Sequence, residues 1–436
     1  MFRYRDVFSI LDKTDLMPED RIRVDKGDKQ AFNELRKQSI FLSNMQKDIL
    51  EGNRVFYWKG DEILWENFFK YFYLVAIDWW VLQISDTSTL DKFAQIEVGR
   101  LHNERVVSDS RFDSFKEATG LKRIIKSLAK SNAQITEVQL EVILGSLEFF
   151  VPRSYEGKIE ELTSGQTDKA LQKIDEWMTE IINASPHELA TMKDFMRSKR
   201  SQLQVATGFA GEHNHLEMAS SFVKVIEKLF SVDSFVACFT KTATNAMMWE
   251  RYADQGNGVV LEFKPDTYID LKEDIFGTYS YQQERIEPVI YESYNKPVNF
   301  FQTFGSFRQV DVFNFFSDDD GNSSLFKDSF IGFADDKEKR ISYWRDWYNA
   351  FLHKDPSYSQ EQETRVIIQP MLALEKEQQT TNYKFSSLKS VTFGPNLAEP
   401  YKAAIRKIIE DKKKKNNISS FEFYQFDGAL GRHPSY

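Results

Sequence analysis

The chain has 436 residues, of which 41% are hydrophobic, and a formal net charge of −9. This length can bury a sizeable core in two or three domains or in one domain with a large insertion. The acidic balance argues against a surface built to coat nucleic acid or an anionic membrane.

The cysteine content and the apolar segments indicate the cellular compartment of the protein. Cys238 is the only cysteine, which excludes an intrachain disulfide and a thiolate metal cluster. Within its strand-like pattern we expect a buried, unreactive thiol. The first residues place charges where a signal peptide needs an apolar region. The most apolar run, Phe68 to Ile84, is short and interrupted by Lys70 and Asp78, so we expect a buried helix there. These features predict a cytoplasmic protein with no membrane partner.

The first half of the chain changes from short strands to helices. Alternating or apolar patterns predict strands at Phe2 to Arg5 and at Ile40 to Asn44. From Asp61 to Phe230, apolar residues recur with a helical period and without a fixed repeat, which favours a helical bundle. The clearest start signal is Ser185-Pro186-His187-Glu188, where serine caps, proline takes the first helical position and glutamate reaches back to the capping amide.

After Phe230, short runs rich in β-forming residues alternate with helical patterns. The expected strands are Phe235 to Thr240, Gly258 to Phe263, Thr278 to Gln282, Glu287 to Tyr291, Thr364 to Gln369, Ser390 to Phe393 and Ser420 to Gln425. The expected helices are Thr244 to Asp254, Pro297 to Phe316, Leu325 to Leu352 and Ala398 to Lys415. We therefore predict an α+β fold. A mixed or antiparallel sheet domain would be formed by residues 1–55 packing on residues 231–436, with residues 56–230 as a large all-α insertion.

The stretch Val236 to Phe263 shows the clearest strand, helix, strand order. Its helix places Trp249 and Tyr252 on one face, and Gly256 stands where a left-handed helix cap is expected. In the second strand Glu262 points away from its apolar neighbours. This carboxylate either lines a cleft or faces water.

A second candidate is Glu361-Gln362-Glu363-Thr364-Arg365. On a strand, Glu361, Glu363 and Arg365 would form one row, since residues two apart share a face. Adjacent carboxylates raise each other's pKa and a neighbouring arginine lowers it, so such a row can hold one ionised and one protonatable carboxyl group. The alternative is a charged edge strand that keeps the protein soluble.

These residues carry a resemblance to a known family. The segment CFTKTATNAMMWERYADQGNGVVLEF resembles the signature of a bacterial family described only as domain of unknown function 2971. Val289 to Tyr291, the E-x-E-x-R row and Val391 to Asn396 are similar to further elements of that family, as are the two opening strands. The family's Asn-Asp-Pro step is absent here, and the helical stretch takes its place, which suggests an insertion.

The layout of this family is similar to the ADP-ribosyltransferase fold, and this likeness implies NAD as a substrate. Cleavage of the nicotinamide glycosidic bond creates oxocarbenium character, which a late glutamate must stabilise. By this resemblance, Glu363 stabilises the ribose and Glu361 orients the acceptor, with Arg365 beside them. The cofactor-binding candidates are Tyr4 or Arg5 for the adenosine ribose or phosphates, Trp249 or Tyr252 for stacking the nicotinamide, and Glu262.

Three hypotheses follow. The first is an NAD-consuming transferase or glycohydrolase, acting as a bacterial toxin or phage-defence effector. The second is a metal-dependent nuclease or phosphoesterase using Glu262, Glu361, Glu363 and the aspartates 318–320, although no metal-ligand spacing is visible and His213-Asn214-His215 lacks a third ligand nearby. The third is a non-catalytic sensor that binds a small nucleotide, with a protein partner on the helical region. We read Lys412 to Lys415 as a solvated helix end and only secondarily as a nucleic-acid contact.

Overall fold

The computed structural model describes residues 1–25, 33–44, 54–82, 87–103, 110–148, 150–157, 168–207, 218–231, 234–264, 267–275, 278–294, 296–303, 315–318, 320–327, 337–369, 379–428 and 431–435. The chain has an α+β fold and divides into two compact units. The α+β unit contains residues 1–53, 233–294 and 345–436, and the helical unit contains residues 54–232 and 295–344. The helical unit thus includes residues 295–344 in addition to the expected insertion.

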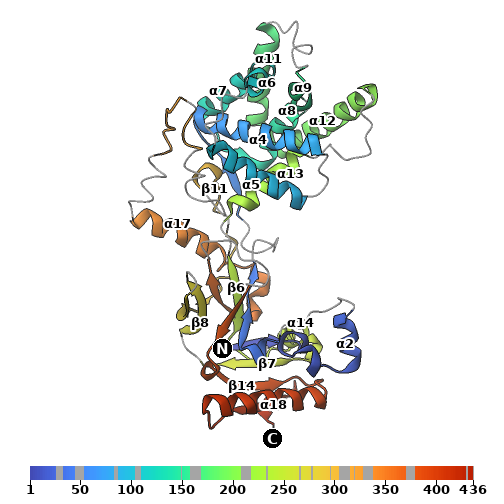
Figure 1. The fold of residues 1–436 in the computed structure, drawn as a ribbon, viewed down its shortest axis with the longest axis vertical. Coiled ribbons are helices and arrows are strands. Elements are labelled where there is room, and N and C mark those ends of the chain that lie inside the picture. Colours follow the sequence, from blue (N-terminus) through green and yellow to red (C-terminus); the bar gives the residue numbers. More distant parts are fainter. Residues whose placement is uncertain are drawn as a thin grey trace. The chain divides into compact units, whose positions relative to one another are not determined.

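A mixed sheet of nine described strands forms the centre of the α+β unit (Figure 1). Its order is β10-β12-β6-β1-β7-β14-β15-β16, with β3 pairing to β6. Among the described strands of this sheet, β14 and β15 pair in parallel and the other neighbours pair antiparallel. The strands are β1 (Phe2–Arg5), β3 (Ser43–Asn44), β6 (Phe235–Thr240), β7 (Val259–Phe263), β10 (Glu287–Pro288), β12 (Glu363–Ile368), β14 (Leu388–Phe393), β15 (Glu422–Phe426) and β16 (Arg432–Pro434).

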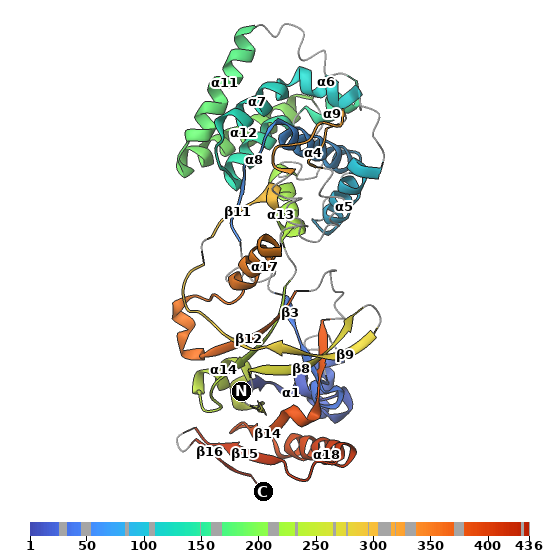
Figure 2. The same cartoon turned by 90° about the vertical axis from the view of Figure 1, so that its left-hand side faces the viewer.

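One face of this sheet packs against the main hydrophobic core. Ala237, Leu261 and Val366 point into this core from three strands, and α18 covers it with Ile405 and Ile409. Figures 1 and 2 both show α18 lying along β14. The helices of this unit are α1 (Val7–Ile10), α2 (Pro18–Asp25), α3 (Glu34–Lys37), α14 (Ala246–Tyr252) and α18 (Glu399–Asn416).

The opposite face of the sheet carries a smaller cluster around α14. Tyr4, Trp249, Val260 and Phe426 belong to this cluster. Asn245 begins the helix because its side-chain oxygen accepts hydrogen bonds from the first backbone amides. Gly256 adopts the predicted left-handed conformation, with φ of +86°. Strand side chains alternate between the two faces of a sheet. The side chains that share the face of this cluster on neighbouring strands are therefore the candidates for a functional site.

A smaller antiparallel sheet, in the order β2-β13-β8-β9, completes this unit. It contains β2 (Ser39–Phe41), β8 (Tyr268–Ile275), β9 (Thr278–Arg285) and β13 (Thr380–Tyr383). The predicted strand at Ile40 to Asn44 is therefore two strands in two different sheets. Strand β8 was not predicted, and it pairs with β9 along its full length.

The helical unit is a bundle with an aromatic core. Trp58 stacks on Phe300 and Trp65 stacks on Phe69 inside it. Its helices are α4 (Glu62–Leu82), α5 (Thr87–Asn103), α6 (Ser110–Ala118), α7 (Leu121–Ser131), α8 (Glu137–Glu148), α9 (Val151–Tyr155), α11 (Asp168–Asn183), α12 (Pro186–Thr207) and α13 (Met218–Phe230), and its short strands are β4 (Phe56–Trp58), β5 (Ile135–Thr136) and β11 (Val298–Asn299). Helix α17 (Lys337–Ala350) crosses the boundary between the two units.

Two sequence predictions in this unit have clear outcomes. The capping motif before α12 is confirmed, because Glu188 accepts a hydrogen bond from the Ser185 amide at 2.7 Å and donates its own amide to the Ser185 hydroxyl. The helix predicted at Pro297 to Phe316 is wrong over its described first part. There Val298 and Asn299 pair with β4, and the Asn299 side chain then caps a 3₁₀ turn.

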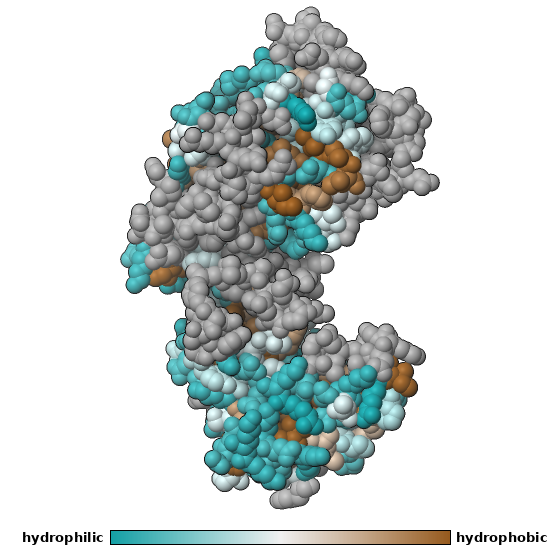
Figure 3. Space-filling view, in the orientation of Figure 1, coloured by the Kyte–Doolittle hydropathy of each residue, from teal (hydrophilic) through white to brown (hydrophobic). Residues whose placement is uncertain are grey.

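The surface of the helical unit includes exposed hydrophobic residues. Figure 3 shows hydrophobic areas among hydrophilic ones on its visible face. Val81, Leu82 and Ile96 in α4 and α5 are among the exposed large hydrophobic side chains. Within the described part of the chain, no helix is both long enough and apolar enough to cross a membrane. The expected helix from Phe68 is the buried α4.

Candidate functional site

Strand register places a group of polar side chains on the face opposite the main core. Glu363 pairs with Thr240, and Arg365 pairs with Cys238. Val366, one residue further on, lies in the main core, so Glu363 and Arg365 point to the other face. Both side chains are buried, with exposed fractions of 5% and 1%. Glu363 and Arg365 are thus buried charges on the central sheet. The alternative prediction of a solvent-exposed charged edge strand does not hold for these two residues.

Glu361 reaches the same place by another route. The predicted row of three residues on one strand is wrong for Glu361, because β12 begins only at Glu363. Glu361 ends the 3₁₀ helix Pro356–Glu361, and Gln362 then adopts a left-handed conformation with φ of +47°. This turn breaks the two-residue alternation between Glu361 and Glu363. The Glu361 side chain is nevertheless buried, with 1% exposed.

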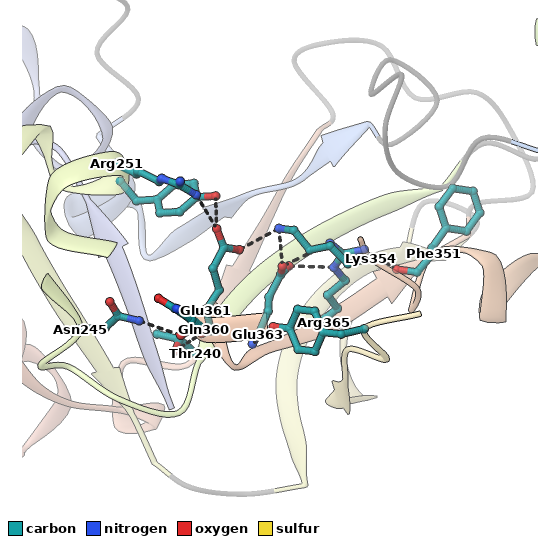
Figure 4. Close-up of polar contacts among 11 residues, drawn as sticks. Thr240, Asn245, Arg251, Phe351, Lys354, Gln360, Glu361, Glu363 and Arg365 are labelled. Carbon is teal, nitrogen blue, oxygen red and sulfur yellow. Dashed lines mark hydrogen bonds and ion pairs between the residues drawn. The ribbon is translucent and has the colours of Figure 1, made fainter. Parts of the chain in front are cut away.

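A single lysine joins the two glutamates (Figure 4). The Nζ atom of Lys354 lies 2.8 Å from Oε2 of Glu361 and 2.9 Å from Oε2 of Glu363. The two carboxylate oxygens therefore lie at most 5.7 Å apart, the sum of these two distances. Lys354 is itself buried. Ammonium groups present three donors in a compact charge, so one lysine can bridge two carboxylates.

Arg365 holds the second carboxylate from the other side. Its Nε donates to Oε1 of Glu363 at 2.7 Å, and its NH1 donates to the Phe351 carbonyl at 2.6 Å. Burial acts to raise the pKa of Glu363, but the charges of Arg365 and Lys354 outweigh burial and hold the pKa below its ordinary value. Glu363 is therefore ionised at neutral pH.

The backbone around the glutamates is fixed by hydrogen bonds from neighbouring elements. The Thr240 hydroxyl donates to the carbonyl of Glu361 at 2.7 Å, and the Asn245 side chain donates to the carbonyl of Gln360 at 2.8 Å. The amide of Glu363 donates to the Tyr291 hydroxyl at 2.7 Å. These contacts hold the two acidic side chains in place, as a preorganised site requires.

Aromatic and basic side chains form the accessible side of the cluster. The hydroxyl of Tyr252 donates to Oε1 of Glu361 at 3.1 Å, while 43% of the tyrosine remains exposed. Arg251 lies 3.6 Å from Glu361 and is also about half exposed. Tyr358 lies beneath both cations, 4.9 Å from Lys354 Nζ and 5.8 Å from the Arg251 guanidinium. Burial and the charge of Glu361 raise the pKa of Tyr252, so its hydroxyl stays protonated.

Cys238 lies next to this cluster, and its expected burial is wrong. Its side chain is exposed because it points to the polar face, whereas Ala237 and Phe239 point into the main core. Neighbouring groups on this inner strand of the sheet nevertheless desolvate the thiol in part. This desolvation, followed by the negative charge of Glu363, raises the pKa of the thiol to about 12. Solvent can reach Cys238, but its thiol stays protonated at neutral pH.

The other predicted binding residues have structural partners. Tyr4 is buried, donates to the Thr242 carbonyl at 3.2 Å and contacts Trp249 edge to face. Trp249 is buried, stacks on Phe426 and donates its indole N–H to the Ala243 carbonyl. Both rings are therefore part of the core around α14, and neither presents a free face.

Arg5 and Glu262 also lie apart from the glutamate pair. Arg5 follows Tyr4 on β1 and so points to the opposite face, where it pairs with Glu34 at 3.0 Å. Glu262 on β7 accepts hydrogen bonds from Lys389 at 2.8 Å, Ser390 at 2.6 Å and Arg432 at 2.5 Å. Of the predicted set, the structure thus brings together Glu361, Glu363, Arg365 and Tyr252.

The metal hypothesis finds little geometric support among the described residues. No group of three or more histidine, cysteine, aspartate or glutamate side chains in the described ranges could hold a metal ion. Lys354 lies between the two glutamates, where a shared cation would bind, and Glu262 has its own basic partners. His213, His215 and Asp319 lie outside the described residues, and Asp318 belongs to the helical unit, where it contacts Asn322.

Sequence reasoning missed Lys354, Arg251 and Tyr358. Lys354 lies in the loop after α17, where no periodic pattern marks it. Its position depends on the bridge between Ile290 and His353, since the Lys354 amide donates to the Ile290 carbonyl at 3.0 Å. This contact joins segments more than sixty residues apart. Arg251 could have been predicted from the sequence, because it adjoins Tyr252 in the recognised helix.

The fold and the site define an α+β domain with a buried, ion-paired pair of glutamates beside exposed tyrosine and arginine side chains. Residues 248–366 match the model of a family described as "Protein of unknown function (DUF2971)", which confirms the predicted resemblance. This segment contains Tyr252, Lys354, Glu361, Glu363 and Arg365. No curated protein and no solved structure matches the chain.

Proposed function

We propose that the α+β unit is an NAD-consuming enzyme, of the ADP-ribosyltransferase or NAD glycohydrolase type. The observation that carries this proposal is the close pair of carboxylates. Glu361 and Glu363 are buried, lie with oxygens at most 5.7 Å apart, and adjoin a tyrosine that keeps an exposed face. The family match covers these residues, but the description of the family names no activity.

Glu363 is the residue that would act on the substrate's sugar. Loss of nicotinamide leaves positive charge on the ribose ring, and a fixed carboxylate stabilises that charge and hydrogen-bonds the adjacent hydroxyl. The lowered pKa of Glu363 supports this role, because the carboxylate is charged before the substrate arrives. Its backbone and both oxygens are already positioned, so little reorganisation accompanies the reaction.

The spacing of the pair supports glycosidic chemistry. In glycosidases, carboxyl groups roughly 5–5.5 Å apart contact the sugar directly, and pairs that admit a water between them lie about 6.5–9.5 Å apart. The Oε2 atoms of Glu361 and Glu363 are at most 5.7 Å apart, so both carboxylates can act on one bound sugar. In our proposal, Glu363 faces the ribose and Glu361 orients the acceptor, which is water in a glycohydrolase and a nucleophilic group in a transferase.

Tyr252 and Arg251 provide the remaining contacts. Tyr252 offers an exposed ring for stacking, which is worth about 1–3 kcal/mol for a planar base. Arg251 is about half exposed, lies 3.6 Å from Glu361 and over the Tyr358 ring, and would bind the diphosphate. We assign no substrate role to Tyr4, Arg5, Trp249 or Glu262, since their polar groups or rings are occupied elsewhere.

The test is incubation of the purified full chain with NAD labelled in its adenylate half. The proposal predicts loss of NAD with wild type and at least a hundredfold slower loss with Glu363→Gln, since removal of one stabilising group costs about that factor. Free labelled ADP-ribose would identify a glycohydrolase, and label on a macromolecule would identify a transferase. Equal inertness of wild type and variant, with both proteins folded, would contradict the proposal.

A further inference from the structure

We propose that Lys354 is the positioning residue of this site: its ammonium group holds the two glutamates together, and the cationic end of the substrate replaces it. This inference rests on the proposed function. Lys354 is the only described side chain with ion pairs to both Glu361 and Glu363. Its ammonium group occupies the place between the carboxylates that a positively charged nicotinamide riboside would take.

The backbone of Lys354 is anchored independently of its side chain. Its amide donates to the Ile290 carbonyl at 3.0 Å, and the Ile290 amide donates to the Leu352 carbonyl at 2.8 Å. Asp355 then caps the 3₁₀ helix Pro356–Glu361, accepting from the Ser357 amide at 2.8 Å. The backbones of Lys354 and Glu361 therefore stay fixed if the lysine side chain moves or is replaced.

The ammonium group has a third partner besides the two carboxylates. The ring of Tyr358 lies 4.9 Å from Nζ, a distance at which a cation is attracted to an aromatic face. When the substrate takes over the carboxylates, this ring remains as a partner for the lysine charge.

Removal of Lys354 would leave the carboxylates without their shared counterion. Arg365 pairs with Glu363, and Arg251 approaches Glu361 at the longer distance of 3.6 Å. Two carboxylates this close repel, so the pair would retain a proton at higher pH. The titratable and charged groups that face the pair are Arg251 and Tyr252 from α14, Cys238 from β6, Tyr291 after β10, Tyr358 from the 3₁₀ helix and Arg365 from β12.

The experiment compares wild type with Lys354→Met and Lys354→Arg, and uses Lys389→Met as a matched control. Lys389 also pairs with a buried glutamate of the same sheet, Glu262, but lies outside the proposed site. Two quantities are measured for each protein: the pH profile of NAD cleavage, and the thermal midpoint without NAD at about pH 5 and about pH 8. The second readout does not depend on activity.

We expect the acid limb of the NAD-cleavage profile to move up by about one pH unit or more in Lys354→Met. We also expect this variant to lose more thermal stability at the higher pH than at the lower, because protonation relieves the repulsion in acid. Lys354→Arg should keep the wild-type profile, and Lys389→Met should show neither effect.

Failure of this inference can be told apart from failure of the proposed function. If wild type does not cleave NAD, the proposed function fails, and the thermal measurement alone decides the role of Lys354. A loss of stability that is equal at both pH values, together with an unshifted activity profile where activity exists, would overturn the positioning role. It would leave Lys354 as a packing residue.

Discussion

The hydroxyl of Tyr252 lies 3.1 Å from Oε1 of Glu361, although the two residues are separated by 109 positions in the chain. This contact connects the helix recognised in the sequence with the late acidic segment. It also orients the tyrosine so that its ring remains partly exposed. The same residue therefore has two separable contributions, a hydrogen bond and a ring face.

Substitutions at Tyr252 should separate these contributions. Tyr252→Phe keeps the ring and removes one hydrogen bond to a charged group, which is worth about 1.5–3 kcal/mol at most. Tyr252→Ala removes both. In our proposal, the alanine variant raises KM for NAD about tenfold or more beyond the phenylalanine variant. Steady-state kinetics of NAD cleavage measure this difference, and equal KM values for the two variants would exclude a stacking role.

Trp249 should behave as a core residue. Its ring packs between Tyr4 and Phe426 and its N–H is bonded to the protein. We expect Trp249→Ala to lower the free energy of unfolding by about 3–5 kcal/mol, as for other buried aromatic residues. The milder Trp249→Phe should leave KM for NAD within about twofold while lowering stability, which urea denaturation and kinetics can establish together. A large rise in KM for a stably folded Trp249→Phe would instead place this ring in the binding site.

Arg365 should be a major source of stability. Its guanidinium group is buried and contacts Glu363 and the Phe351 carbonyl. Arg365→Met leaves a buried carboxylate with fewer partners, a change that costs about 3–5 kcal/mol in the free energy of unfolding. Lys389→Met removes a half-exposed lysine from the buried Glu262, which keeps its hydrogen bonds from Ser390 and Arg432, so this variant should cost about 1 kcal/mol or less. Similar losses for the two variants in urea denaturation would contradict this assignment.

The pKa of Glu363 predicts a pH dependence of stability. The pKa is lower in the folded protein, where Arg365 and Lys354 outweigh the effect of burial, than the ordinary glutamate value. Such a group stabilises the fold above the unfolded-state pKa, and this contribution is lost as pH falls through the folded-state pKa. The thermal midpoint of wild type should therefore exceed that of Glu363→Gln most at neutral pH. The difference should shrink below about pH 4.5. A difference that grew in acid would contradict the lowered pKa.

Cys238 should react slowly despite its exposure. A pKa near 12 leaves about a thousandfold less thiolate at neutral pH than an ordinary cysteine has. Alkylation with iodoacetamide, followed by intact-mass measurement, should therefore be slow in the folded protein and fast after unfolding. Since Glu363 contributes to the raised pKa, Glu363→Gln should accelerate the reaction. Alkylation of the native protein at the rate of a free thiol would show that the pKa is not raised.

The sequence predicted those parts of the fold that local patterns determine. Alternating strands at Phe235 to Thr240 and Ser390 to Phe393, and the capped helix after Ser185, appear at or near the expected residues. Strand β8 was missed because its charged residues interrupt the alternation, and pairing with β9 stabilises it instead. The segment after Pro297 was misassigned because tertiary pairing with β4 overrides its local pattern.

The candidate site was predictable only in part. Glu363, Arg365 and Tyr252 follow from motif and spacing. The left-handed turn at Gln362 moves Glu361 off the strand, and no periodicity indicates such a turn. Trp249 and Tyr4 could be recognised as aromatic residues of interest. Their packing against each other in the core depends on the tertiary structure and has no signal in the sequence. Lys354 depends on a bridge between distant segments and has no sequence signal of its own.

The measurement that tests the central claim most directly is the rate of NAD cleavage by wild type, Glu363→Gln and Glu262→Gln. Each protein is first shown to be folded. Glu262 is a matched control, since it is a buried and ion-paired glutamate on the same face of the sheet. We predict activity in wild type and Glu262→Gln, and at least a hundredfold loss in Glu363→Gln. Undiminished cleavage by Glu363→Gln, or none by wild type, would contradict a catalytic glutamate pair at this site.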